Sequence, residues 1–223
     1  MNKMLASVNC LEEAMIVEQA QVDIIDLKQP SLGALGALEL DVVSQIVNSP
    51  QLSKAISATV GDLPMQADTI FNAVEKMAAT GVDYVKIGFF PEGNWLPIIQ
   101  QLKSLTQANI KLIAVLFADQ NPDLNTLKDF ALAGFCGVML DTMDKKNGSL
   151  TQVMPRQEIQ NFVENSKKYK LLCGLAGSLR LQDIANLKPL QADYLGFRGA
   201  LCNQHQRTSA IDQQALLAIR SAL

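Results

Sequence analysis

The sequence predicts an α/β protein, a single-domain (β/α)8 barrel (TIM barrel) that spans residues 1–223. Three observations favour this fold class. Short apolar runs alternate with helical patterns along the whole chain, a weak internal repeat counts eight β–α units, and 223 residues lie within the usual size range of the fold. No Pro/Gly/Ser-rich linker, low-complexity run or charge block divides the chain, so we expect one domain.

The expected strands are near-continuous apolar runs, which are typical of parallel strands buried on both faces. They cover residues 3–8, 22–28, 55–60, 82–88, 111–117, 136–141, 170–174 and 193–198. Helix signals stand between them. Asn9 with Glu12 three residues later indicates a capping box for the first helix. Gly81 ends a helical run, and Pro155 opens a later helix.

The internal repeat consists of the segments QVDIIDLK, GVDYVKIG, FCGVMLD and QADYLGFRG. Their equivalent positions are Asp23, Asp83, Gly137 and Asp193, which are 60, 54 and 56 residues apart. Each interval has room for two β–α units, so the repeats fall on the second, fourth, sixth and eighth strands. A doubly wound parallel sheet is the alternative, but it needs a switch point, and no G-x-G-x-x-G motif follows the first strand.

Charged residues make up only 18% of the chain, against about 25% in an ordinary soluble domain. The net charge is −3 and no dense Lys/Arg block is present, so nucleic-acid binding fits poorly. The single histidine, His205, excludes a His-rich metal cluster. We expect His205 to lie in an exposed loop without a catalytic role, and we expect neither a metal nor a cofactor.

The same composition indicates compartment and partners. The four cysteines form no C-x-x-C pair, which indicates reduced thiols in a cytoplasmic protein. The longest apolar run, 112–118, is too short to span a bilayer, and residues 1–13 do not resemble a signal peptide. We therefore expect a cytoplasmic homo-oligomer that acts on a small molecule and binds neither membrane nor nucleic acid.

Five charged residues stand at the ends of even-numbered strands or just after them, where barrel enzymes build their active sites. Asp26 and Lys28 end the second strand and, being two residues apart, point to the same side. Lys86 lies on the fourth strand, Asp141 ends the sixth, and Lys145 follows four residues later. We expect all five to converge at the carboxyl-terminal rim of the barrel.

Two lysines that face one pocket repel each other, so one of them loses its proton more readily. A neutral lysine amine is the nucleophile that forms a Schiff base with a carbonyl. Asp26 and Asp141 could then hold the other lysine charged and relay protons. The alternative is that each lysine pairs with an aspartate as a structural salt bridge. The spacing is compatible with both interpretations, and it favours Schiff-base or proton-transfer chemistry over structural salt bridges.

Glycine-containing loops, LAGSLR and FRGALC, follow the last two strands. Barrels often bind phosphate with backbone N–H groups of these two loops. Gly177 and Gly199 would let the backbone approach an anion, Ser178 could donate its hydroxyl, and Arg198 could add charge. The alternative is that these glycines only turn the chain from strand to helix.

Two further features have two interpretations each. Thr59 and Asp62 end the third strand and could line the pocket, although Asp62 could equally cap a helix. The loop 29–38 after the second strand could close over a substrate or could be a plain connection.

Together these segments resemble one known family. VDIIDLKQP with LGA, SATVGD, VDYVKIG, VMLDT with a later lysine, LAGS and FRGALC occur in the order typical of (5-formylfuran-3-yl)methyl phosphate synthase, also called 4-(hydroxymethyl)-2-furancarboxaldehyde-phosphate synthase. The resemblance runs from the second strand to the eighth. It implies a (β/α)8 lyase of methanofuran biosynthesis that condenses two molecules of glyceraldehyde 3-phosphate into the phosphorylated furan aldehyde, with release of phosphate and water.

The resemblance also implies residue roles. Lys28 in DLK would be the Schiff-base lysine and Lys86 in YVKIG the proton-transfer residue, and assistance would come from Asp26, Asp141 and Lys145. Other functions stay open. The segment also resembles the D-x-K-x-x-D signature of orotidine-phosphate-decarboxylase-like enzymes, although Ser31 stands where the last aspartate is expected. Another Schiff-base aldolase, or a non-catalytic sugar-phosphate-binding barrel, is the remaining alternative.

Overall fold

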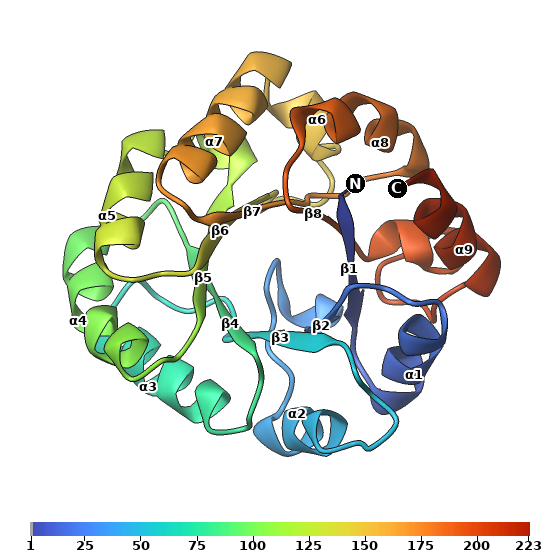
Figure 1. Ribbon diagram of the computed structural model, residues 1–223, viewed down its shortest axis with the longest axis horizontal. Helices are drawn as coiled ribbons and strands as arrows, with labels where there is room; N and C mark the ends of the chain where they lie inside the picture. Colours follow the sequence, from blue (N-terminus) through green and yellow to red (C-terminus); the bar gives the residue numbers. More distant parts are fainter. Residues whose placement is uncertain (1) are drawn as a thin grey trace.

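The protein is described by a computed structural model over residues 2–223 (Figure 1). Within this range eight parallel strands pair in sequence order, and the first also pairs with the last, so the sheet closes into a barrel. The strands are β1 (Lys3–Val8), β2 (Ile24–Leu27), β3 (Ala55–Thr59), β4 (Tyr84–Phe89), β5 (Leu112–Phe117), β6 (Gly137–Asp141), β7 (Leu172–Leu175) and β8 (Tyr194–Phe197). The predicted barrel is confirmed, and the doubly wound sheet is excluded because its edges would stay unpaired.

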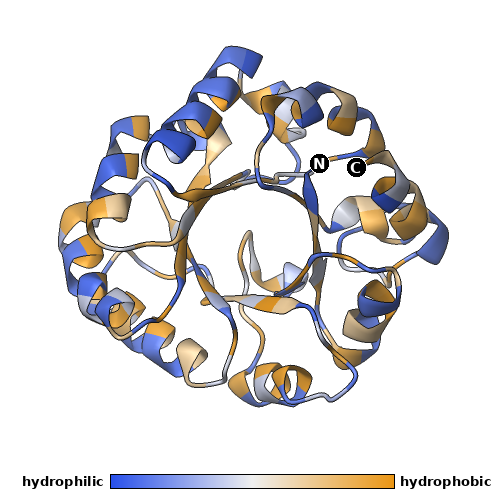
Figure 2. Cartoon of the chain, in the orientation of Figure 1, coloured by the Kyte–Doolittle hydropathy of each residue, from blue (hydrophilic) through white to orange (hydrophobic). Residues whose placement is uncertain are grey.

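Helices surround the barrel (Figure 1). They are α1 (Leu11–Gln19), α2 (Leu40–Val47), α3 (Ala67–Ala78), α4 (Trp95–Gln107), α5 (Leu127–Leu132), α6 (Leu150–Val153), α7 (Arg156–Lys168), α8 (Leu181–Leu187) and α9 (Gln213–Ala222). Figure 2 shows apolar colour on the strands and polar colour on outer helix faces, most clearly on α7. Among residues 2–223, no helix has the length and apolar character needed to cross a bilayer.

Two apolar clusters stabilise this arrangement. The larger one fills the layer between strands and helices, where Val, Ile, Leu and Phe side chains are removed from water. The smaller one lies inside the barrel and includes Leu5, Ile113, Val115, Met139 and Tyr194. The barrel interior also holds charged side chains, and the packing of an apolar core does not require them.

The repeated aspartates join neighbouring strands at their amino-terminal ends. The carboxylates of Asp23, Asp83 and Asp193 accept backbone N–H groups of the preceding strand at 2.8, 2.8 and 2.7 Å. At the third repeat position, Gly137, an added Cβ would lie 2.8 Å from the Leu172 carbonyl oxygen, so no side chain fits there. These aspartates therefore satisfy backbone donors and lie away from the carboxyl-terminal rim.

The expected capping box of the first helix is wrong. α1 begins after Cys10, which forms no side-chain cap. The Asn9 N–H instead donates to the carboxylate of Glu13 at 3.0 Å. The physical reason is that Glu13 turns inward to pair with Arg198, whereas Glu12 stays in solvent.

Candidate active site at the carboxyl ends of the strands

A cavity of about 360 Å³, here called the rim cavity, lies at the carboxyl-terminal ends of the strands. Its walls include every residue that the sequence singled out for catalysis or phosphate binding: Asp26, Lys28, Lys86, Asp141, Lys145, Gly177, Ser178, Arg198 and Gly199. The even-numbered strands with the loops after them, and the loop after β7 that carries Gly177 and Ser178, bring these residues together. The structure thus shows that these residues lie around one cavity. Their chemical roles stay predictions.

Asp26 and Lys86 form a buried ion pair inside the barrel. Lys86 Nζ lies 2.8 Å from Asp26 Oδ1, and both side chains are almost completely buried. Hydroxyl groups complete the carboxylate shell, because Ser7 donates to Oδ2 at 2.8 Å and Ser57 donates to Oδ1 at 2.7 Å. Burial opposes ionisation of Asp26, but Lys86 and Lys28 outweigh it and lower its pKa. Asp26 is therefore an ionised counter-ion directly beside Lys86.

A second ion pair stands at the rim. Lys145 Nζ lies 2.5 Å from Asp141 Oδ1 and also contacts the Thr142 carbonyl oxygen. The Thr142 N–H donates to the same carboxylate oxygen at 2.7 Å. Burial alone would raise the pKa of Asp141, but Lys145 and Lys28 lower it to about 2. Asp141 is thus a fixed negative charge beside the cavity.

Lys28 is the exception among these lysines. Its side chain is buried, yet its amine makes no ion pair or hydrogen bond with any residue from 2 to 223. Burial lowers its pKa to about 8, against a partly opposing effect of Asp141. At neutral pH about a tenth of such amines is uncharged, far more than for a solvated lysine. The salt-bridge alternative therefore describes Lys86 and Lys145, while Lys28 keeps a free amine in the cavity.

The loop after β7 presents unpaired backbone donors to the rim cavity. Gly177 and Ser178 both have positive φ angles, +106° and +48°, and a Cβ on Gly177 would lie 2.8 Å from Thr142. The N–H groups of Gly177, Ser178 and Leu179 donate to no other residue within 2–223. Consecutive N–H groups in such a turn form a concave anion site.

Arg198 lines the rim cavity as expected, but protein groups bind its guanidinium. Its guanidinium binds Glu13 at 2.5 and 3.2 Å and donates to the carbonyl oxygens of Ser7, Arg207 and Ser209. All five of its donors are engaged, so it is poorly available to an anion. It instead fastens the segment 203–210 to the barrel.

Sequence reasoning missed two other arginines of the rim cavity. Arg180 NH1 is the only buried side-chain nitrogen or oxygen without a partner among residues 2–223. Arg207 also lines the cavity, and burial lowers its pKa. His205 is exposed as expected but lies at the cavity edge. The available signal was the arginine that ends LAGSLR, close to the expected phosphate loop.

The loop after β2 is held in place. The Asp62 carboxylate accepts the N–H groups of Ala34 and Leu35, each at 2.7 Å. Thr59 donates to the Gly36 carbonyl oxygen at 3.0 Å, and Arg207 donates to that of Gly33 at 2.9 Å. Asp62 thus neither lines the rim cavity nor caps a helix.

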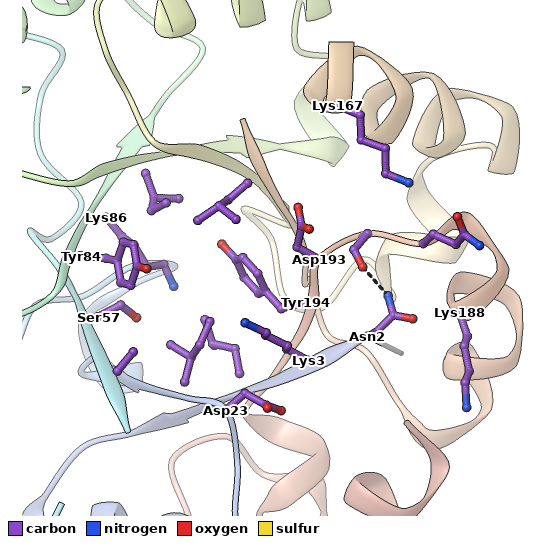
Figure 3. Close-up of a pocket in the computed structure, with 17 residues that line it drawn as sticks. Asn2, Lys3, Asp23, Ser57, Tyr84, Lys86, Lys167, Lys188, Asp193 and Tyr194 are labelled. Atoms are coloured by element: carbon purple, nitrogen blue, oxygen red, sulfur yellow. Dashed lines mark hydrogen bonds between the residues drawn. The ribbon is translucent and has the colours of Figure 1, made fainter. Parts of the chain in front are cut away.

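A second cavity of about 580 Å³, here called the amino-terminal cavity, enters the barrel from the opposite end (Figure 3). Tyr84, Ser57 and Tyr194 line it, and Lys86 belongs to the walls of both cavities. The Lys86 layer therefore separates two spaces inside one barrel.

The fold and this set of residues define a class, the (β/α)8-barrel enzymes. 3-Hexulose-6-phosphate synthase from Salmonella typhimurium aligns with a TM-score of 0.71 and 17% identity, over 99% of this chain and 97% of that one. Phosphoribosyl anthranilate isomerase from Thermus thermophilus aligns with a TM-score of 0.66 and 12% identity, over 100% and 98%. At these identities the likeness shows the fold alone.

Within this class the chain belongs to the 4-HFC-P synthase family, whose sequence profile matches residues 4–220. A homologue from Methylorubrum extorquens is 37% identical over 98% of this chain and 92% of its own length. Proteins named (5-formylfuran-3-yl)methyl phosphate synthase from Methanococcus maripaludis and Methanocaldococcus jannaschii are 30% and 31% identical, over 96% and 94% of this chain and 95% and 94% of their own lengths. The resemblance seen in the motifs is confirmed, and the homologues support a synthase role.

Proposed function

We propose that this protein condenses two molecules of glyceraldehyde 3-phosphate into (5-formylfuran-3-yl)methyl phosphate, with release of phosphate and water, through a Schiff base on Lys28. The observation that carries the proposal is the contrast among the lysines of the rim cavity. Lys86 and Lys145 are each paired with a carboxylate, whereas Lys28 is buried without one. A cytoplasmic step of methanofuran biosynthesis is the setting that the family name and the substrate favour.

The first step falls to Lys28. Its neutral amine attacks the carbonyl carbon of one triose phosphate, in the ketone form, and water leaves as the imine forms. The protonated imine withdraws electrons from the adjacent carbon, so that carbon gives a proton to a carboxylate of the site and becomes the nucleophilic carbon of an enamine. The enamine then attacks the aldehyde carbon of the second molecule.

Proton transfers fall to Lys86. Its Nζ lies 2.8 Å from the Asp26 carboxylate, so we propose that it gives a proton to an oxygen that leaves or gains negative charge and is reprotonated afterwards. Asp141 and Lys145 form the second acid–base pair, at the rim. Loss of phosphate and water can thus proceed without histidine.

The phosphate groups find cationic and N–H donors on the other side of the cavity. Gly177 and Ser178 offer backbone N–H groups, and Arg180, which lines the same cavity, has a guanidinium nitrogen without a partner among residues 2–223. An added Cβ at Gly199 would lie 3.3 Å from that nitrogen, so the glycine lets the arginine approach. We propose Arg180, in place of Arg198, as the cation that meets phosphate.

The test combines product and adduct. The protein is incubated with glyceraldehyde 3-phosphate, and ultraviolet absorption of a furan aldehyde is followed. Borohydride is added in parallel, and peptides are searched for a reduced adduct on Lys28. Lys28→Met should abolish both signals, and Lys128→Met, at an exposed lysine of α5, should leave both unchanged. Absence of the adduct from the Lys28 peptide of an active protein would exclude covalent catalysis there.

A further inference from the structure

The amino-terminal cavity is unusual for the interior of a barrel. Barrel interiors are ordinarily filled by bulky branched side chains, but here the small residues Ala55 and Ser57 line a space of about 580 Å³ (Figure 3). Lys86 faces this space as well as the rim cavity. A residue proposed to carry protons is therefore reachable from the end opposite to the substrate.

Tyr194 places an unpaired hydroxyl in the amino-terminal cavity. Its side chain is only 4% exposed, and its ring covers Gly174, where an added Cβ would lie 2.4 Å from ring atoms. The hydroxyl makes no hydrogen bond with any residue from 2 to 223. Figure 3 shows the ring reaching across the cavity toward the side of Lys86 and Ser57.

Water is the partner that this hydroxyl requires. Because Arg180 NH1 is the only buried side-chain nitrogen or oxygen without a partner among residues 2–223, the Tyr194 oxygen is open to the space of the cavity. Nearly all polar groups in such positions are bonded to protein or water. A cavity of this size with several polar groups has the room and the polar partners that water needs. Ser57 extends the polar wall upward, because it donates to Asp26 Oδ1, the oxygen that also accepts from Lys86.

The charges at the mouth favour water over a specific ligand. Lys3, Lys167 and Lys188 are exposed there, and the acidic residues Asp23 and Asp193 line the same cavity. Asp23 and Asp193 are already bound to backbone N–H groups. The mouth is therefore mixed in charge and open to solvent.

We propose that the amino-terminal cavity is the route by which Lys86 exchanges protons with solvent, with the Tyr194 hydroxyl and water as relay. The proposal rests on the proton-transfer role given to Lys86 above. When Lys86 has given a proton to the reacting oxygen, its neutral amine accepts one from a cavity water. Tyr194 passes a proton to that water and takes one from the next, so a solvent proton is consumed and no electrons move.

The first test does not depend on catalysis. Lysine side chains are labelled with nitrogen-15, and the exchange of the Lys86 ammonium protons with water is measured by NMR. Ala55→Phe, which narrows the amino-terminal cavity, should slow this exchange severalfold. Ala185→Phe, the same change at an exposed position of α8, should not. An unchanged exchange rate in Ala55→Phe overturns the proposal.

The second test uses turnover. Tyr194→Phe keeps the ring and removes the hydroxyl, so it should lower kcat about fivefold or more and enlarge the solvent deuterium isotope effect. Borohydride trapping on Lys28 should stay intact, which separates this result from failed folding or binding. Tyr169→Phe, at a tyrosine outside the cavity, is the matched control. Unaltered kcat and isotope effect in Tyr194→Phe would refute the relay. A wild-type protein that traps no triose phosphate would instead count against the proposed function, and the exchange measurement would still decide the route.

Discussion

Asp26 lies 2.8 Å from the ammonium of Lys86, although Lys28, two residues further along the chain, also faces the rim cavity. The Asp26 carboxylate thus forms an ion pair with Lys86 and not with Lys28. The two lysines can therefore take different roles in the proposed chemistry. The paired Lys86 can donate protons, and the unpaired Lys28 can act as the nucleophile.

Asp26→Asn should cost both stability and turnover. The change leaves the buried Lys86 without its counter-ion, and breaking a buried pair typically destabilises by about 3–5 kcal/mol. Adding Lys86→Met to Asp26→Asn should recover much of that loss, because no unpaired charge remains. Denaturant unfolding of the two single variants and the double variant measures the coupling. Strict additivity would show that the pair does not interact as the distance implies.

The activity should rise with pH through about 8, the lowered pKa of Lys28. Burial disfavours the charged amine, and only the neutral amine attacks a carbonyl, so protonation at lower pH removes the nucleophile. Well below this pKa, kcat/KM should increase about tenfold per pH unit and then level off. Stopped assays between about pH 6.5 and about pH 9 suffice. A flat profile across that range would place the nucleophile elsewhere.

Much of the fold was accessible from the sequence because its signals are local. Each strand is a short apolar run that is buried on both faces, and each predicted strand is confirmed with ends shifted by at most two residues. The convergence of Asp26, Lys28, Lys86 and Asp141 follows from strand number and parity alone. A parallel barrel places every strand end on one rim, so these positions needed no knowledge of packing.

The sequence did not predict which groups bind the charged side chains. The sequence predicts that Arg198 binds phosphate, but its guanidinium binds Glu13, which lies 185 positions earlier in the chain. Arg180 ends the LAGSLR segment and was given no role, yet its NH1 has no partner among residues 2–223. Which arginine is free depends on contacts between α1 and the loop after β8, and no local pattern encodes those contacts.

Arg180→Gln should weaken phosphate recognition with little effect on imine chemistry. A hydrogen bond to a charged group contributes about 1.5–3 kcal/mol, so KM should rise about tenfold to a hundredfold. Inhibition by inorganic phosphate should weaken in parallel, and kcat should change much less. Arg156→Gln is the control, because that arginine is exposed and bonds only the Asn186 carbonyl oxygen. An unchanged KM in Arg180→Gln would show that backbone N–H groups alone bind the phosphate.

Glu13→Gln should raise KM by loosening the segment that carries Arg207 and His205. Arg198 ties that segment down through the carbonyl oxygens of Arg207 and Ser209, and Glu13 holds Arg198 in turn. A rise of about tenfold corresponds to about 1.4 kcal/mol of lost binding. The borohydride adduct on Lys28 at saturating substrate should persist, since Glu13 touches neither lysine. Glu12→Gln, one residue earlier and exposed, provides the matched control. Equal KM values for the two variants would mean that the pair stabilises the barrel without positioning the site, whereas a rise confined to Glu13→Gln would show that α1 controls the far side of the rim cavity.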